Sequence, residues 1–166
     1  MKYLFVLIFF IVFFTFDKSI GYTNTSPVWT HFTYMFQHAN IIHLGINSLA
    51  FIGMFRVLEK IINKYFLASI ILSISVIASF TSIYPLPTVG ISGAVYAMIG
   101  IYLAMIATKK LILKDRNKLY IFLFSVSLCL LVSFFKTNSN FRLHLVSLIL
   151  GFLFWMIVEL WNIINE

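Results

Sequence analysis

The distribution of apolar residues along the chain is the feature that most restricts its fold. Six mostly apolar runs, several of them close to the about 20 residues that a helix needs to cross about 30 Å of hydrocarbon, are separated by short polar segments. The chain is 61% hydrophobic and only 10% charged, whereas a soluble domain carries about 25% charged residues. A water-soluble domain is therefore excluded. The runs are Tyr3–Phe16, Ile41–Leu58, Tyr65–Tyr84, Gly90–Thr108, Leu119–Phe135 and Leu143–Val158.

This pattern predicts an all-α, polytopic membrane protein in which residues 1–166 form one membrane-embedded domain with six transmembrane helices. The first run has an alternative reading, because Lys2 followed by an apolar stretch also resembles a signal peptide. However, Thr15-Phe16-Asp17-Lys18 offers no small-residue cleavage site. We therefore expect the first helix to be retained.

Basic residues orient the predicted helices. If the N-terminus is cytoplasmic, the outer segments carry only Lys18, Lys136 and Arg142, and the other nine basic residues are cytoplasmic, as the positive-inside rule requires. Both termini are then expected in the cytoplasm, and the outer segment Gly21–Gln37, which mixes aromatic and polar residues, is expected to lie in or dip into the interface. The cytoplasmic nine are Lys2, Arg56, Lys60, Lys64, Lys109, Lys110, Lys114, Arg116 and Lys118.

The net charge of +7 does not indicate a nucleic-acid partner, because the charges form short clusters between apolar runs and no basic stripe on a polar helix. The single cysteine, Cys129, excludes a disulfide framework or a CxxC zinc site. The lipid bilayer is the partner that the composition predicts.

Four polar residues share one predicted depth. In the topology above the second, fourth and sixth helices all begin at the outer face, and His43, Asn47, Ser92 and His144 lie within about two turns, roughly 10 Å, of those beginnings. Strongly polar groups inside a membrane are costly and usually face a bundle interior or a water-filled cavity. These residues are therefore expected to cluster in the outer third of the bilayer.

Ser92 lies in Gly90-Ile91-Ser92-Gly93, after a proline-containing segment that ends the preceding helix. It is expected at the N-terminus of the fourth helix, where flanking glycines allow close approach of other groups. A serine hydroxyl becomes a nucleophile when a base takes its proton. The alternative role for Ser92 is that of an N-cap or a small packing residue.

His144 is the candidate base at the matching depth of the sixth helix. Ser147 and Gly151 follow it on the same helix face, and small residues there allow close approach of another helix. The fourth helix offers a similar face, so the two helices are expected to pack and to bring His144 to Ser92. The alternative for His144 is a structural interhelical hydrogen bond. The small residues of the fourth helix are Gly93, Ala97 and Gly100.

His43 and Asn47 are four residues apart and share one helix face, so they can aim two donors at one point. Two donors directed at a developing oxyanion are what acyl transfer requires. A zinc site built on His38 and His43 is disfavoured, because their spacing places them about 500° apart around a helix and no HExxH glutamate is present. We expect neither a metal nor a cofactor, and assign no role to His31.

These residues resemble the rhomboid family of intramembrane serine proteases. The likeness rests on HxxxxHxxxN in the second helix, GxSG at the start of the fourth, and a histidine early in the sixth. The order and depth of the three motifs agree with the six-helix rhomboid core over about residues 3–161, in its minimal bacterial form. The motif residues are His38, His43, Asn47, Gly90, Ser92, Gly93 and His144.

The resemblance implies a serine endopeptidase that cleaves transmembrane protein substrates in or near a membrane-spanning segment. It assigns Ser92 as the nucleophile and His144 as the general base, in a dyad without a carboxylate. It assigns the oxyanion hole to His43, Asn47 and the backbone N–H of Ser92. The active site would open to the outer face of a bacterial cell membrane.

Other roles follow from the same resemblance. His38 would line the cavity and help to hold its water, Tyr96 would pack against the catalytic histidine, and Glu59 would be a structural acid at the inner end of the second helix. Two positions depart from the family pattern: Trp29 is followed by threonine rather than arginine, and Ser147 stands where glycine is common. The first concerns anchoring of the outer loop, and the second concerns helix packing.

Three alternatives belong to other functional classes. A catalytically inactive relative that binds membrane proteins would be expected to lack the serine or the histidine, and this chain has both. A haem or metal protein would use His38, His43 and His144, against which the spacing argues. A transporter would show interrupted helices in repeated halves, which the sequence lacks.

Overall fold

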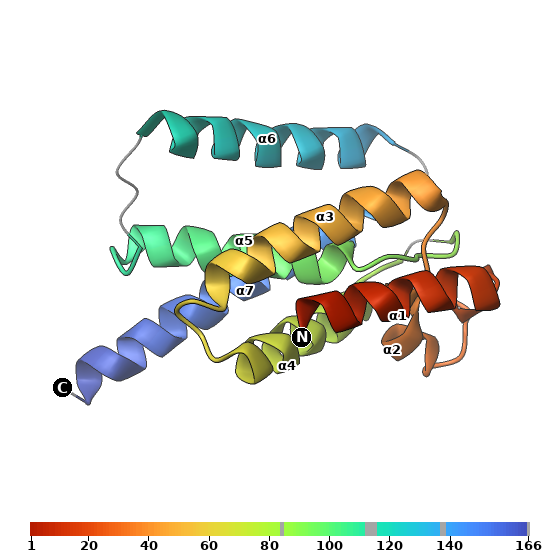
Figure 1. Cartoon of the computed structure of the whole chain (residues 1–166), viewed down its shortest axis with the longest axis horizontal. Coiled ribbons are helices and arrows are strands. Elements are labelled where there is room, and N and C mark those ends of the chain that lie inside the picture. Colours follow the sequence, from red (N-terminus) through yellow and green to blue (C-terminus); the bar gives the residue numbers. More distant parts are fainter. Residues whose placement is uncertain (84, 112–115, 137–138, 166) are drawn as a thin grey trace.

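The computed structural model describes residues 1–83, 85–111, 116–136 and 139–165, and this part of the chain is all-α (Figure 1). One isolated antiparallel bridge joins Tyr22 to Thr88. The α-helices are α1 (Lys2–Thr15), α2 (Thr30–Thr33), α3 (Ile41–Leu58), α4 (Lys64–Ser79), α5 (Ser92–Ala107), α6 (Arg116–Phe135) and α7 (Phe141–Ile164), and the 3-10 helices are η1 (Lys18–Ile20) and η2 (Tyr34–Phe36).

The longer α-helices coincide with the six predicted apolar runs. By length and composition α3, α6 and α7 are able to cross a membrane, whereas α1, α4 and α5 are shorter apolar helices. The all-α prediction and the presence of helices apolar enough to span a bilayer are thus confirmed, and the count of six spans remains a prediction. Tyr84, the last residue of the predicted third helix, lies outside the described residues, and so does Lys114, one of the nine basic residues predicted to be cytoplasmic.

Several helix ends differ from the predicted runs for local reasons. α4 ends at Ser79, shortly before Pro85. The backbone N–H groups of the next three residues, 80–82, donate to carbonyl oxygens three residues earlier, and not four residues earlier as in an α-helix. α5 begins at Ser92 rather than Gly90, because Gly90 has a φ of 118°, outside the helical region. α7 continues beyond Val158 to Ile164.

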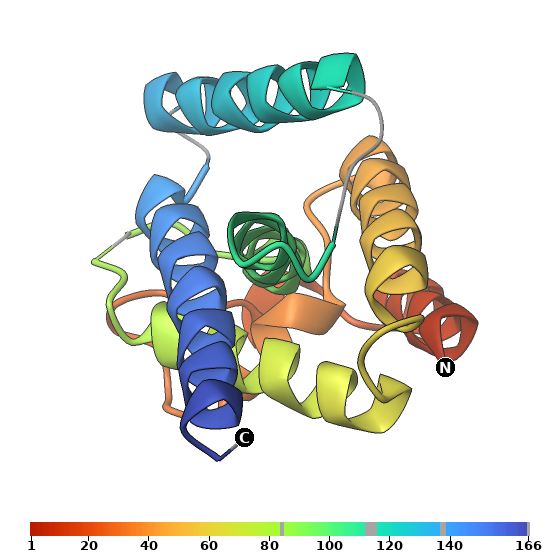
Figure 2. The same cartoon turned by 90° about the vertical axis from the view of Figure 1, so that its left-hand side faces the viewer.

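α5 occupies the middle of the bundle, with α3, α4 and α7 around it (Figure 2). Its closest neighbour is α7, and the contact is made by backbone. A Cβ added at Gly100 would lie 2.1 Å from the carbonyl oxygen of Leu148, and one added at Gly151 would lie 2.1 Å from that of Ala97. Small residues therefore let these two helices approach closely, as their sequence predicted.

α6 lies at the edge of the bundle in both views and meets the other helices at only a few side chains (Figures 1 and 2). Among its residues only Val126 and Ser133 are buried. Tyr102 of α5 meets Phe122 edge to face, with ring centroids 5.1 Å apart. An apolar pocket of about 420 Å³ lies between α6 and the α3 and α5 helices, with Gly53, Val95 and Cys129 among its lining residues.

The loop between α1 and α3 is held by polar contacts to α4, although it lacks the Trp-Arg pair noted in the sequence comparison above. His31 Nδ1 lies 2.6 Å from Ser79 Oγ, and the His31 ring lies between Tyr22 and Phe80, at centroid distances of 4.0 and 3.8 Å. The Tyr34 hydroxyl donates to the carbonyl oxygen of Ser75 at 3.0 Å. Burial lowers the pKa of His31 and raises that of Tyr34.

Replacement of Gly100 by alanine should destabilise the bundle, because the new methyl group would occupy the space of the α7 backbone. Overpacking of this kind costs about 1–3 kcal/mol, so the thermal unfolding midpoint in detergent should fall by several degrees. Gly53→Ala is the matched control, since an added Cβ there meets nothing within 4 Å and the helix gains propensity. Equal midpoints for the two variants would contradict backbone contact between α5 and α7.

His31 should make the stability of the fold depend on pH. Its pKa is lowered from 6.5 in the folded state, so below pH 6.5 the unfolded chain takes up more protons and the free energy of unfolding decreases. The contribution is fully present above pH 6.5 and is lost as the pH falls. His31→Gln, which does not titrate, should reduce the difference in unfolding midpoint between pH 8 and pH 5; an unchanged difference would contradict this assignment.

Candidate active site

Ser92 is the first residue of α5 and points its hydroxyl at α7. The preceding chain is fixed by a bond from the N–H of Gly90 to the carbonyl oxygen of Tyr34, 3.0 Å long. Ser92 Oγ lies 2.9 Å from His144 Nε2, so the structure brings together the two residues that the sequence predicted would meet. Residues 52 positions apart thus form a hydrogen-bonded pair at the ends of two packed helices.

The start of α7 fixes the position of His144. Asn140 caps the helix by accepting from the N–H of Leu143, and its amide donates to Ser82 Oγ at 2.6 Å and to Thr88 Oγ1 at 3.0 Å. The His144 ring stacks on Tyr96, with centroids 4.6 Å apart and planes 25° apart. Tyr96 therefore packs against this histidine, the place that the resemblance implied for it.

The second ring nitrogen of His144 also has a partner. Nδ1 lies 2.8 Å from Ser133 Oγ, and Ser133 Oγ lies 2.7 Å from Ser139 Oγ. If Nε2 accepts the Ser92 hydroxyl proton, then Nδ1 carries the ring proton and donates it to Ser133. In this tautomer the lone pair of His144 Nε2 faces the Ser92 hydroxyl.

His43 and Asn47 lie beside Gly90, next to Ser92. A Cβ on Gly90 would lie 2.8 Å from His43 Cε1 and 3.2 Å from both His43 Nε2 and Asn47 Nδ2, so glycine makes room for both side chains. The backbone N–H of Ala39 donates to His43 Nδ1 at 3.3 Å, which leaves the proton on Nε2. Asn47 Nδ2 is buried and has no hydrogen-bond partner among the described residues. Two N–H donors are therefore available next to the serine.

Gly93 follows Ser92 and faces the interior of the bundle. A Cβ there would lie 3.1 Å from Ser75 Oγ, 3.2 Å from the Tyr34 hydroxyl and 3.4 Å from Ser147 Oγ. Ser147, the departure from the family pattern, is fully buried at this contact. The glycine therefore allows α4, α7 and the loop between α1 and α3 to approach the beginning of α5.

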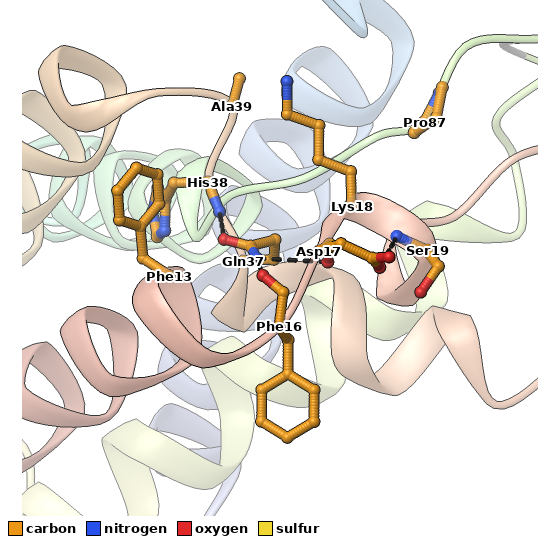
Figure 3. Close-up of a pocket in the computed structure, with 9 residues that line it drawn as sticks. All are labelled: Phe13, Phe16, Asp17, Lys18, Ser19, Gln37, His38, Ala39 and Pro87. Atoms are coloured by element: carbon orange, nitrogen blue, oxygen red, sulfur yellow. Dashed lines mark hydrogen bonds between the residues drawn. The ribbon is translucent and has the colours of Figure 1, made fainter.

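His38 is buried beside His43, their ring centroids 5.4 Å apart, and also contacts Phe9. Burial, and secondarily the neighbouring His43, lowers the pKa of His38 to about 3, which keeps its ring neutral at physiological pH. Gln37 links it to the end of α1 by accepting from the His38 backbone N–H and donating to the carbonyl oxygens of Phe16 and Asp17 (Figure 3).

His38 lines an open cavity of about 640 Å³ between the end of α1 and the segment before α3 (Figure 3). Neither Ser92 nor His144 is among the residues that line this cavity, so the role of His38 in a cavity at the serine stays a prediction. Within the described ranges, no three histidine, cysteine, aspartate or glutamate side chains converge as they would around a metal ion. The other residues around the cavity are Phe13, Phe16, Asp17, Lys18, Ser19, Gln37, Ala39 and Pro87.

Glu59 lies at the opposite end of α3 from His43, and its carboxylate forms an ion pair with Lys2 at the start of α1. The pair ties these two helices together far from the serine, which suits the structural role that the resemblance implied.

Ser133 is the site residue that the sequence analysis missed. It lies near the end of the apolar run Leu119–Phe135, on the side of the predicted bundle where the second, fourth and sixth helices begin. The same depth argument that selected Ser92 and His144 would have found it, had it been applied to helix ends as well as to helix beginnings.

Comparison with known proteins identifies the family of the chain. The model of the family described as "Rhomboid domain" matches residues 25–160. "Putative rhomboid protease YdcA" of Bacillus subtilis (strain 168) is 29% identical over 130 residues, which cover 75% of this chain and 64% of that protein. This chain therefore spans slightly less than two thirds of the length of that relative. Because the family model covers most of the chain, including all of the residues that converge on Ser92, the protein belongs to the rhomboid family.

Proposed function

We propose that the protein is an intramembrane serine endopeptidase that hydrolyses a peptide bond in or near a transmembrane segment of other membrane proteins. The observation that carries this proposal is the hydrogen bond of 2.9 Å between Ser92 Oγ and His144 Nε2. A serine paired with an unprotonated imidazole nitrogen is the arrangement that activates a hydroxyl for attack. Family membership supports the same class of reaction.

In this mechanism His144 Nε2 takes the proton of Ser92 as Oγ attacks the scissile carbonyl carbon. The C–O bond forms, the carbonyl oxygen takes up the electron pair, and a tetrahedral intermediate results. His144 then gives the proton to the leaving amine as the C–N bond breaks, leaving an acyl-enzyme. Water, deprotonated by the same nitrogen, hydrolyses the ester and restores Ser92.

The oxyanion is stabilised by three donors in this proposal: His43 Nε2–H, the Asn47 amide and the backbone N–H of Ser92. Support comes from the position of the two side chains around Gly90, from the bond that leaves the His43 proton on Nε2, and from the buried Asn47 amide. Such donors are most effective when they are fixed before the charge develops and are shielded from bulk water.

We further propose that six helices span a bacterial cell membrane, with both termini in the cytoplasm and the site opening to the outer face. The distribution of basic residues supports this orientation. The Lys2–Glu59 pair supports it as well, since it joins the start of α1 to the end of α3 that lies farthest from His43. A site in the outer third of the bilayer is within reach of water, which hydrolysis consumes.

Ser92→Ala and His144→Ala should each abolish cleavage of a single-span model substrate reconstituted with the purified protein, because one removes the nucleophile and the other the base. Fluorophosphonate labelling should be lost in Ser92→Ala and strongly slowed in His144→Ala. Ser69→Ala is the control, since this exposed serine of α4 bonds to the carbonyl oxygen of Tyr65. Cleavage by Ser92→Ala at the wild-type rate would end the proposal.

Asn47→Ala should lower kcat by about 10²-fold with little change in KM, because it removes a donor that acts on the developing oxyanion. The neighbouring Ser48→Ala is the matched control, since Ser48 is also buried on α3. An Asn47→Ala variant with wild-type kcat would exclude this residue from the oxyanion hole and leave the serine–histidine pair in place.

A further inference from the structure

Ser133 lies between α6 and the start of α7 and bonds to two groups. Its Oγ is 2.8 Å from His144 Nδ1 and 2.7 Å from Ser139 Oγ. The residue is 6% exposed, on a helix where Val126 is the other buried residue. The hydroxyl is therefore turned inward, from an otherwise exposed helix, onto the ring that contacts Ser92.

A helical serine in an apolar environment has a simpler way to satisfy its hydroxyl. Ser125, two turns earlier on α6, donates to the carbonyl oxygen of Ile121 at 2.8 Å, within its own helix. Ser133 bonds instead to side chains beyond α6. Packing alone does not explain this difference, because an apolar side chain would suit a helix that faces lipid.

The hydrogen bond between Ser133 and His144 determines which nitrogen of the imidazole ring carries the proton. For Nε2 to accept the Ser92 proton, Nδ1–H must point away from Ser92, and Ser133 Oγ is placed to accept from it. The Ser133 hydroxyl can then donate to Ser139 Oγ. When His144 becomes an imidazolium, both of its N–H groups are paired, and no proton passes to Ser133.

We propose that Ser133 is a positioning residue for the base: it holds His144 in the tautomer and orientation that accept the proton of Ser92. This inference rests on the proposed protease function. It places a neutral hydroxyl where a serine protease triad has a carboxylate. Since Ser133 belongs to α6, it also makes the readiness of His144 depend on the outer end of α6 lying against α7.

The test compares Ser133→Ala, Ser133→Thr and the control Ser125→Ala in the purified full chain. Ser133→Ala should lower kcat by about tenfold with KM nearly unchanged, the order expected for loss of one hydrogen bond that orients the base. Fluorophosphonate labelling of Ser92 should slow by a similar factor without substrate. Ser133→Thr, which keeps the hydroxyl, should recover most of both rates, and Ser125→Ala should match wild type.

Two outcomes would overturn the inference: wild-type kcat and labelling in Ser133→Ala, or equal loss in the alanine and threonine variants, which would show a requirement for shape rather than for a hydroxyl. Thermal unfolding in detergent is measured for each variant, and a Ser133→Ala loss accompanied by a lowered midpoint that Ser133→Thr does not restore counts against the inference. Failure of the proposed function is distinguishable, because it appears as undiminished cleavage by Ser92→Ala.

Discussion

The backbone contact between α5 and α7 is the constraint on which the candidate site depends. Gly100 and Gly151 leave no room for a side chain between the helices, so the two axes are held at a fixed separation and register. Ser92 begins one helix and His144 lies in the first turn of the other, so that register determines the distance of 2.9 Å between their side chains. In lipid, where apolar burial gives helices little reason to associate, such close packing carries much of the association energy.

Near the ends of α5 and α7 that carry Ser92 and His144, several polar side chains form hydrogen bonds to residues far away in the sequence. Asn140 joins the start of α7 to Ser82 and Thr88, on the segment leading into α5. Leaving a buried polar group without its hydrogen-bond partner costs about 1–3 kcal/mol of folding free energy. Movement of either segment away from the other would incur this cost, so each hydrogen bond holds the two segments together. The amide of Asn47 is one of several buried side-chain groups without a hydrogen-bond partner among the described residues, and in the proposed mechanism its free donor suits a charge that exists only during reaction.

The sequence was sufficient for the parts of the structure that repeat a simple rule. Apolar runs predicted the long helices, and the small residues around Ala97 and Gly151 predicted the contact between α5 and α7. Depth within the bilayer predicted that Ser92 and His144 would meet. The end of α4 at Ser79 and the start of α5 at Ser92 were not predicted, because they depend on turn hydrogen bonds and on the positive φ of Gly90.

Ser133 shows where prediction from a single sequence stops. A serine in an apolar helix has the same local sequence signal whether it bonds to its own backbone, as Ser125 does, or reaches another helix. Only the placement of α6 against the start of α7 separates the two cases, and α6 has the smallest buried share of the three helices long enough to cross a membrane. In the proposed mechanism His144 is oriented by a residue of this largely exposed helix, which couples the proposed chemistry at Ser92 to the position of α6.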